Sequence, residues 1–132
     1  MKALRTLVLF EAATFVAAAS IHFGALVDGY EHHRAGTAET VIAAVLVAGF
    51  ALSFVRPREA VVGAQAFATL GVCVGLFTIA VGVGPRTAPD IAYHLAILAL
   101  LITGLGVTSL RPPPSRDAEP ELRRATRARR SG

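Results

Sequence analysis

Histidine and carboxylate side chains fall near the ends of three apolar stretches of this 132-residue chain. His22 lies near the end of the first stretch, and Glu39 lies near the start of the second. His94 follows Asp90 by about one helical turn at the start of the last stretch. Imidazole and carboxylate groups together are ligands that Zn, Cu(II), Ni and Fe select in proteins. The sequence therefore predicts that three helices deliver these groups to one layer, where they would bind a transition metal or a small ligand.

The polar segment between the first two stretches adds two adjacent histidines to this layer. The predicted metal-site residues are His22, His94, Asp90, Glu39, His32 and His33. A carboxylate such as Asp90 or Glu39 could orient a liganding histidine by hydrogen bonding. A narrower version makes His22 and His94 the axial ligands of a haem. The alternative is that these groups are ordinary polar residues of helix ends and loops, hydrogen-bonded to one another.

Glu11 lies within the first apolar stretch and needs a partner there. A charged side chain at the centre of a membrane helix costs roughly 2.5–3.5 kcal/mol on insertion scales. Glu11, Phe15, Ala18 and His22 follow heptad spacing and so share one helix face, which we expect to point inward. Gln65 lies at a matching depth in an antiparallel third stretch, which predicts a Glu11–Gln65 hydrogen bond. That bond would fix helix register; proton transfer or ion coordination by Glu11 is the alternative.

The elements that position these residues are expected to be transmembrane helices. The chain is 54% hydrophobic and 17% charged, and residues 40–55, 60–85 and 91–110 contain no Asp, Glu, Lys or Arg. Apolar runs of roughly 17–25 helical residues cross the hydrocarbon core. We therefore predict an all-α protein, with residues 1–110 forming an antiparallel bundle of four transmembrane helices. The predicted spans are 5–27, 38–55, 60–83 and 89–110.

The distribution of basic residues predicts the orientation of the bundle. Eleven of the 13 Lys and Arg residues fall on one side of the predicted spans, leaving Arg34 and Arg86 on the other. The positive-inside rule then places both termini in the cytoplasm. Twelve arginines against one lysine are compatible with a GC-rich bacterial genome, so we expect the membrane to be a bacterial inner membrane. Residues 111–132, which begin Arg-Pro-Pro-Pro, are expected to form a disordered basic tail. The basic surplus fits anionic lipid headgroups, so no nucleic-acid partner is expected. A cleavable signal peptide is the alternative for the first span.

Small residues predict where helices pack closely, because membrane helices associate where small side chains let backbones approach. The third stretch carries Ala64, Ala68, Gly71, Gly75, Thr78 and Gly82. The first carries Ala13, Ala17, Ser20 and Gly24. We expect these two seams to pack within the bundle, or alternatively to bind a second copy or another membrane subunit. Thr87 is expected to cap the fourth helix, with Asp90 three residues on as in a capping box.

The chain lacks the residues that common enzyme classes require. It contains no P-loop, no Gly-x-Ser-x-Gly, no His-Glu-x-x-His and no pair of cysteines, so catalysis is not expected. Tyr30 and Tyr93 are interpreted as anchors at the membrane interface. Three functions stay open: ligand binding at the extracytoplasmic end, a structural or assembly subunit of a membrane complex, and a proton- or ion-coupled transporter subunit that uses Glu11 and His22.

One family resemblance supports this layout. Glu11, the turn Ile21-His22-Phe23-Gly24 and the segment from Phe77 to His94 resemble small four-helix bacterial membrane proteins. The general layout is similar to that of DoxX-type proteins. The resemblance implies the four-helix membrane topology and no particular activity.

Overall fold

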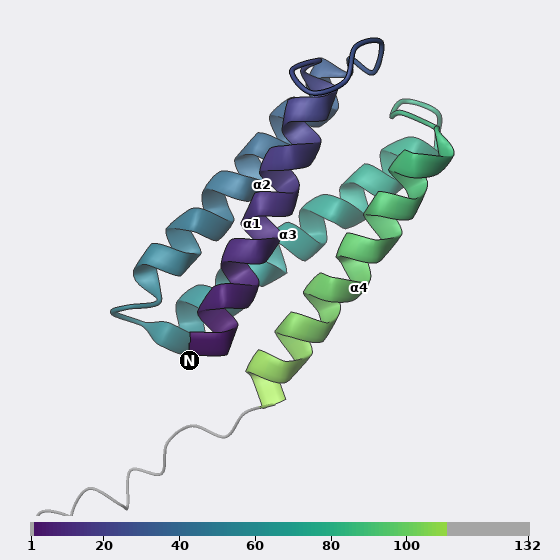
Figure 1. The fold of residues 1–132 in the computed structure, drawn as a ribbon. Coiled ribbons are helices and arrows are strands. Elements are labelled where there is room, and N and C mark those ends of the chain that lie inside the picture. Colours follow the sequence, from purple (N-terminus) through teal and green to yellow (C-terminus); the bar gives the residue numbers. More distant parts are fainter. Residues whose placement is uncertain (1, 111–132) are drawn as a thin grey trace, which may run out of the picture.

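The computed structural model describes residues 2–110, which form four helices and no strand (Figure 1). The helices are α1 (Lys2–His22), α2 (His33–Leu52), α3 (Pro57–Ala80) and α4 (Ala88–Leu110). The prediction of an all-α chain with four long apolar helices is confirmed, since each helix is long and apolar enough to cross a membrane. The predicted disordered tail, residues 111–132, lies outside the described residues.

The helices end earlier than the sequence predicted. The first helix was expected to continue to residue 27 and the third to residue 83, but they end at His22 and Ala80. Gly24 and Gly82 follow these ends with φ of 73° and 86°. This left-handed backbone conformation is accessible to glycine at no steric cost and stops a helix. The apolar residues beyond each glycine therefore belong to loops.

The second and third helices also begin earlier than predicted. The expected starts were residues 38 and 60, whereas α2 begins at His33 and α3 at Pro57. The His32 ring nitrogen Nδ1 accepts a hydrogen bond from the Ala35 backbone N–H at 3.3 Å and so caps α2. Proline is favoured at the first position of a helix, because its missing N–H would have no partner there. Local capping thus extends helices into residues that hydropathy assigns to loops.

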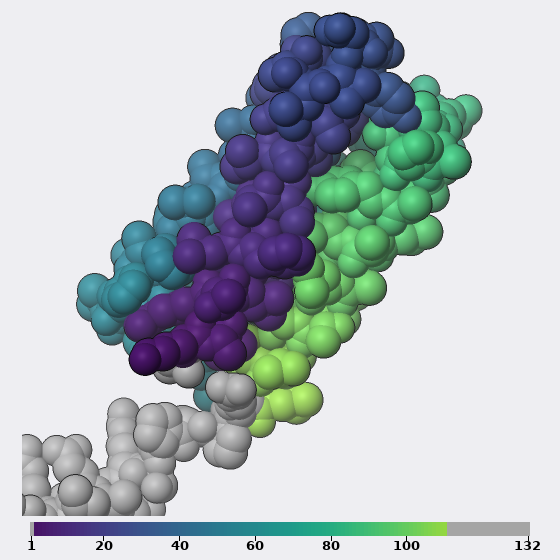
Figure 2. Space-filling view, viewed as in Figure 1, coloured from purple at the N-terminus to yellow at the C-terminus, as the bar shows by residue number. Residues whose placement is uncertain are grey.

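Consecutive helices run antiparallel (Figure 1), and α3 has helix contacts on two sides. It packs against α2 on one side and α4 on the other, while α1 packs along most of α2. Figure 2 shows α1 and α4 side by side on one face of the molecule. Val8, Phe15, Leu46 and Leu101 are almost completely buried in the core between the helices.

The outer surface of the bundle is apolar. Leu70, Phe77 and Leu95, for example, are 65%, 66% and 55% exposed. Soluble proteins rarely present large apolar surfaces to water. The described part of the chain is therefore consistent with a multi-pass membrane protein whose outer face contacts lipid.

The small-residue seam of α3 packs within the chain. A Cβ added at Gly49 of α2 would overlap the Cβ of Ala64, and one added at Gly71 would lie 2.7 Å from Ile42. The prediction of close packing along α3 is confirmed. Ala13 and Ala17 of α1 are exposed, so the prediction that this seam packs within the chain is wrong, and its alternative role in binding a second copy or another membrane subunit stays a prediction. The buried face of α1 instead contains Glu11 and the residues at heptad spacing from it. Ala13 and Ala17 lie on a different face of the helix.

The two ends of the bundle differ in chemistry. At the end that includes the start of α1, which we call the basic end, Arg5 donates to the Ser53 hydroxyl and carbonyl oxygens at 3.0 and 2.9 Å. At the same end Arg58 donates to the Ser109 carbonyl oxygen at 2.7 Å. Both arginines thus meet carbonyl groups at helix carboxyl ends, where the helix dipole favours cations. The opposite end, with loops 23–32 and 81–87, is called the histidine end.

Candidate functional site: a buried cluster and cavity at the histidine end

Three ionisable side chains from three helices form a hydrogen-bonded cluster at the histidine end. His22 of α1 lies between the other two, with Nδ1 2.7 Å from Glu39 Oε2 of α2 and Nε2 3.2 Å from Asp90 Oδ1 of α4. All three residues are buried. The prediction that three helices deliver these groups to one layer agrees with this geometry.

The two hydrogen bonds of His22 limit where protons can lie within the cluster. Each bond needs one proton between nitrogen and oxygen, and a neutral imidazole supplies only one. The second proton is either on His22, beside two carboxylates, or on one carboxyl group, beside a neutral His22. With no proton beyond these two, both arrangements give the trio a net charge of −1. In that state the histidine end holds a buried negative charge, and one further proton on a carboxyl group makes the trio neutral without breaking either bond.

His94 lies next to this cluster in a defined orientation. Its Nδ1 is 2.7 Å from the Asp90 backbone carbonyl oxygen. Because a carbonyl oxygen only accepts, Nδ1 carries the proton, and in the neutral ring Nε2 keeps its lone pair. The ring lies against Gly75 of α3, where an added Cβ would be 3.0 Å from Nε2. A glycine at this position lets the imidazole approach the α3 backbone.

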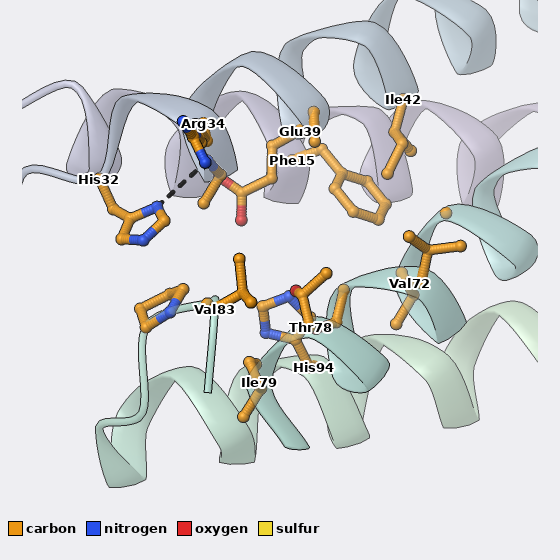
Figure 3. A pocket seen from close by; sticks show the side chains of 17 residues that line it. Phe15, His32, Arg34, Glu39, Ile42, Val72, Thr78, Ile79, Val83 and His94 are labelled. Atoms are coloured by element: carbon orange, nitrogen blue, oxygen red, sulfur yellow. Dashed lines mark hydrogen bonds between the residues drawn. The ribbon is translucent and has the colours of Figure 1, made fainter. Parts of the chain in front are cut away.

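A cavity of about 200 Å³ opens beside the cluster, between α2, α3 and α4. In Figure 3 Glu39 extends into this cavity from α2, with His94 and Thr78 on the opposite wall. Most other lining side chains are apolar, among them Phe15, Ile42, Val72, Ile79 and Val83. Glu39 is 4% exposed, and its Oε1 has no hydrogen-bond partner in the described chain. A buried polar atom without a partner is costly, so Oε1 identifies an acceptor position that a ligand could satisfy.

A second cavity, of about 310 Å³, lies on the other side of the cluster between α1 and α4. His22 and Asp90 line it together with Tyr30 and Tyr93. The Tyr93 ring packs edge-on against Phe15 and its buried hydroxyl has no partner among the described residues, so its interpretation as a membrane-interface anchor is wrong. The cluster therefore separates two cavities of different lining.

Four of the six predicted metal-site residues meet at this end, and two do not join them. His22, Glu39, Asp90 and His94 are buried together, while half-buried His32 caps α2 with its ring centre 6.4 Å from that of His22, and His33 is exposed beside Phe23. Within residues 2–110, no group of three or more His, Cys, Asp and Glu side chains is arranged to hold a metal ion. Both ring nitrogens of His22 face carboxylates, so neither is directed at a metal or haem iron.

The predicted Glu11–Gln65 hydrogen bond is present deeper in the bundle. The Gln65 amide nitrogen donates to the two Glu11 carboxylate oxygens at 3.0 and 3.2 Å, and the Thr108 hydroxyl donates to the Gln65 amide oxygen at 3.5 Å. Buried Phe15 and Ala18 separate this pair from His22 on the same face of α1. The two polar sites are therefore distinct.

Sequence reasoning missed part of the site. Gly75 appeared only as a seam residue, because nothing in the sequence pairs it with His94. Thr87 was expected only as a cap, yet its hydroxyl hydrogen-bonds both to the Asp90 carboxylate and, at 2.7 Å, to the Tyr30 hydroxyl. The available signal was the spacing of Thr87 and Asp90, which predicted contact between them.

Comparisons of the chain with models of protein families, with curated proteins and with solved structures give no match. The resemblance to DoxX-type proteins therefore stays a prediction. A function has to be inferred from the geometry of the histidine end.

Proposed function

We propose that this chain is a multi-pass protein of a bacterial inner membrane that binds a small organic cation at its extracytoplasmic end. Both termini and the basic end face the cytoplasm in this proposal, because lysine and arginine favour that side. The histidine end then faces outward. The observation that carries the proposal is that Glu39, which lines the cavity, has a buried oxygen atom, Oε1, with no hydrogen-bond partner among residues 2–110.

The charge and the walls of the cavity favour an organic cation. The cluster of Glu39, His22 and Asp90 holds one negative charge, and His94 Nε2 adds a second acceptor. An ammonium group would donate to these acceptors and offset the charge. The apolar side chains on the remaining walls suit a hydrocarbon body. An engineered cavity of about 150 Å³ in another protein binds benzene, so a cavity of about 200 Å³ has room for a ring with a short amine.

A transition metal fits this geometry less well. Glu39 Oε1 and His94 Nε2 supply two ligands, whereas closed metal sites in proteins use about four. The bound group is therefore proposed to be held by hydrogen bonds and by burial of its apolar part.

The test uses benzylamine and its uncharged isostere ethylbenzene on the detergent-purified full chain. We expect benzylamine to raise the thermal unfolding midpoint more than ethylbenzene does, because only benzylamine donates to Glu39. A ligand at 100 times its Kd stabilises the folded state by about 2.7 kcal/mol. Glu39→Gln should abolish the difference between the two ligands, because the amide can turn an N–H toward the cavity and removes the charge.

Asp28→Asn provides the matched control, since it makes the same chemical change at an exposed position of the same end. It should leave the benzylamine effect unchanged. Equal effects of benzylamine and ethylbenzene on the unmodified chain would overturn the proposal. Metal analysis of the same preparations tests whether the ligand is a metal ion instead. Stoichiometric Zn, Cu or Fe in the unmodified chain that is lost in both Glu39→Gln and His94→Ala would show that the ligand is a metal ion and overturn the proposal of an organic cation.

A further inference from the structure

The cluster continues as an unbroken series of hydrogen bonds from the first cavity to the surface of the histidine end. Glu39 bonds to His22 and His22 to Asp90, as described above. The other carboxylate oxygen of Asp90, Oδ2, accepts from the Thr87 hydroxyl, and the Thr87 oxygen lies 2.7 Å from the Tyr30 hydroxyl. This last bond is exposed. Four side chains thus connect the buried Glu39 carboxylate to water.

The directions of these bonds follow from the chemistry of their members. The Thr87 hydroxyl has one proton, which it donates to the Asp90 carboxylate. Its bond to Tyr30 must then be donated by the Tyr30 hydroxyl. The tyrosine oxygen keeps lone pairs that can accept from water at the exposed end. The orientation of Tyr30 and Thr87 is therefore the one that carries a proton inward.

Each member of the series can both receive and pass on a proton. Carboxyl groups and hydroxyl groups donate and accept, and imidazole does so through its two nitrogens. When a ligand occupies the cavity and binds Glu39 Oε1, it blocks direct proton transfer from Glu39 to water through the cavity. The series lies on the far side of Glu39, toward the second cavity, and stays available.

We propose that the series Tyr30–Thr87–Asp90–His22–Glu39 conducts a proton between the outer surface and the cavity, so that the cavity exchanges a proton for its cation. This inference rests on the proposed function and adds a coupled proton to it. When the cation leaves, hydronium at the surface gives a proton to the Tyr30 oxygen. Each member then passes on a proton, and one O–H bond forms at Glu39. After this transfer the Thr87 and Tyr30 O–H bonds point outward, so when the cation binds the steps reverse and a proton passes from Asp90 through Thr87 and Tyr30 to water.

The exchange keeps the charge of the site constant. The trio is at −1 with a bound monovalent cation and at zero when the extra proton has replaced that cation. A buried site avoids an uncompensated charge in both states. The other titratable groups that face the cluster are His32, whose ring centre is 6.4 Å from that of His22, and His94 and Tyr93 of α4. Thr78 is the polar side chain that α3 contributes to the cavity, and Arg34 of α2 also lines it.

Two measurements on the full chain in detergent test the proposal. The first counts the protons released per bound benzylamine with an indicator dye in weak buffer. Benzylamine stays protonated at neutral pH, so a released proton comes from the protein. We expect about one proton per bound amine, and Glu39→Gln should release none.

The second measurement tests the route by NMR of 15N-histidine-labelled protein with benzylamine bound. The His22 ring N–H protons should exchange with water quickly in the unmodified chain. Thr87→Val removes the linking hydroxyl and should slow this exchange by about tenfold or more. Thr87→Ser should restore it. Thr40→Val is the matched control, because the exposed Thr40 hydroxyl bonds only to the Gly36 carbonyl oxygen of its own helix.

Thr87 also caps α4, so Tyr30→Phe serves as a second variant that keeps the ring and removes the terminal hydroxyl. It should slow the exchange as well. Benzylamine binding without proton release would overturn the exchange and leave the proposed function standing. Exchange at the unmodified rate in both Thr87→Val and Tyr30→Phe would overturn the route. Failure of benzylamine to bind would overturn the proposed function, and the inference with it.

Discussion

At the scale of single residues, the molecule places its few buried polar side chains in pairs or small groups. Gln65 donates to Glu11, and Glu39 and Asp90 share His22. Each pairing reduces the cost of a polar group inside an apolar bundle. Glu39 Oε1 and the Tyr93 hydroxyl are the buried side-chain atoms of residues 2–110 without a partner, and both belong to residues that line cavities.

The Glu11–Gln65 pair predicts a specific pattern of stabilities. Gln65→Leu leaves a buried carboxyl group without its donor and should destabilise the fold by about 1–3 kcal/mol. The double variant Glu11→Leu/Gln65→Leu removes both polar groups, so it should recover most of that loss. Unfolding in mixed detergent and SDS measures both. A double variant that is as unstable as the sum of the two single variants would contradict a direct interaction.

At the scale of helices, the packing of α3 against its neighbours depends on glycine residues at a few contact positions. Gly49 meets Ala64 and the Ala60 carbonyl oxygen, so the α2 and α3 backbones approach closely there. Gly63 and Gly106 face open space. Glycines within the helices thus differ in structural role, and substitution can separate them.

Gly49→Ala should therefore be destabilising by about 1–3 kcal/mol, because the new methyl group would overlap Ala64 and force α2 away from α3. Gly63→Ala and Gly106→Ala are the controls. Each should be neutral or slightly stabilising, since alanine is the better helix former by about 1 kcal/mol. Equal effects of all three substitutions on detergent unfolding would show that the α2–α3 contact is not as close as described.

The contact of α3 with His94 links packing to the site. Gly75→Ala would place a methyl group 3.0 Å from His94 Nε2 and 3.1 Å from Cδ2, so the ring must shift. We expect benzylamine binding to weaken by roughly 1 kcal/mol, or about fivefold. A binding titration checks this, with Gly63→Ala as the matched glycine substitution. Unchanged affinity in Gly75→Ala would mean that the position of the His94 ring does not matter for binding.

At the scale of the whole molecule, the two ends are built for different surroundings. Arg5 and Arg58 meet helix carboxyl ends at the basic end, whereas the histidine end holds the buried carboxylates and both cavities. This asymmetry, together with the basic residues of the chain, favours one orientation in a membrane.

Reporter fusions test that orientation. A fluorescent protein fused after Gly132 should fluoresce, and alkaline phosphatase fused there should be inactive, because both report a cytoplasmic end. Phosphatase inserted in the loop between Ala80 and Ala88 should be active. An active phosphatase after Gly132 would invert the orientation and place the cavity on the cytoplasmic side.

The sequence by itself determined the four apolar helices, the inward face of α1 and the Glu11–Gln65 bond, because hydropathy, periodicity and depth are local or one-dimensional properties. It also indicated that His22, Glu39, Asp90 and His94 share a layer. Only the tertiary structure decided that His22 lies between two carboxylates, that Glu39 faces a cavity and that Tyr30 completes the series of hydrogen bonds. Those facts depend on the rotation and separation of α1, α2 and α4, which are set by packing at positions such as Gly49 and Gly75. Sequence periodicity gives the face of each helix but not the neighbour that the face meets.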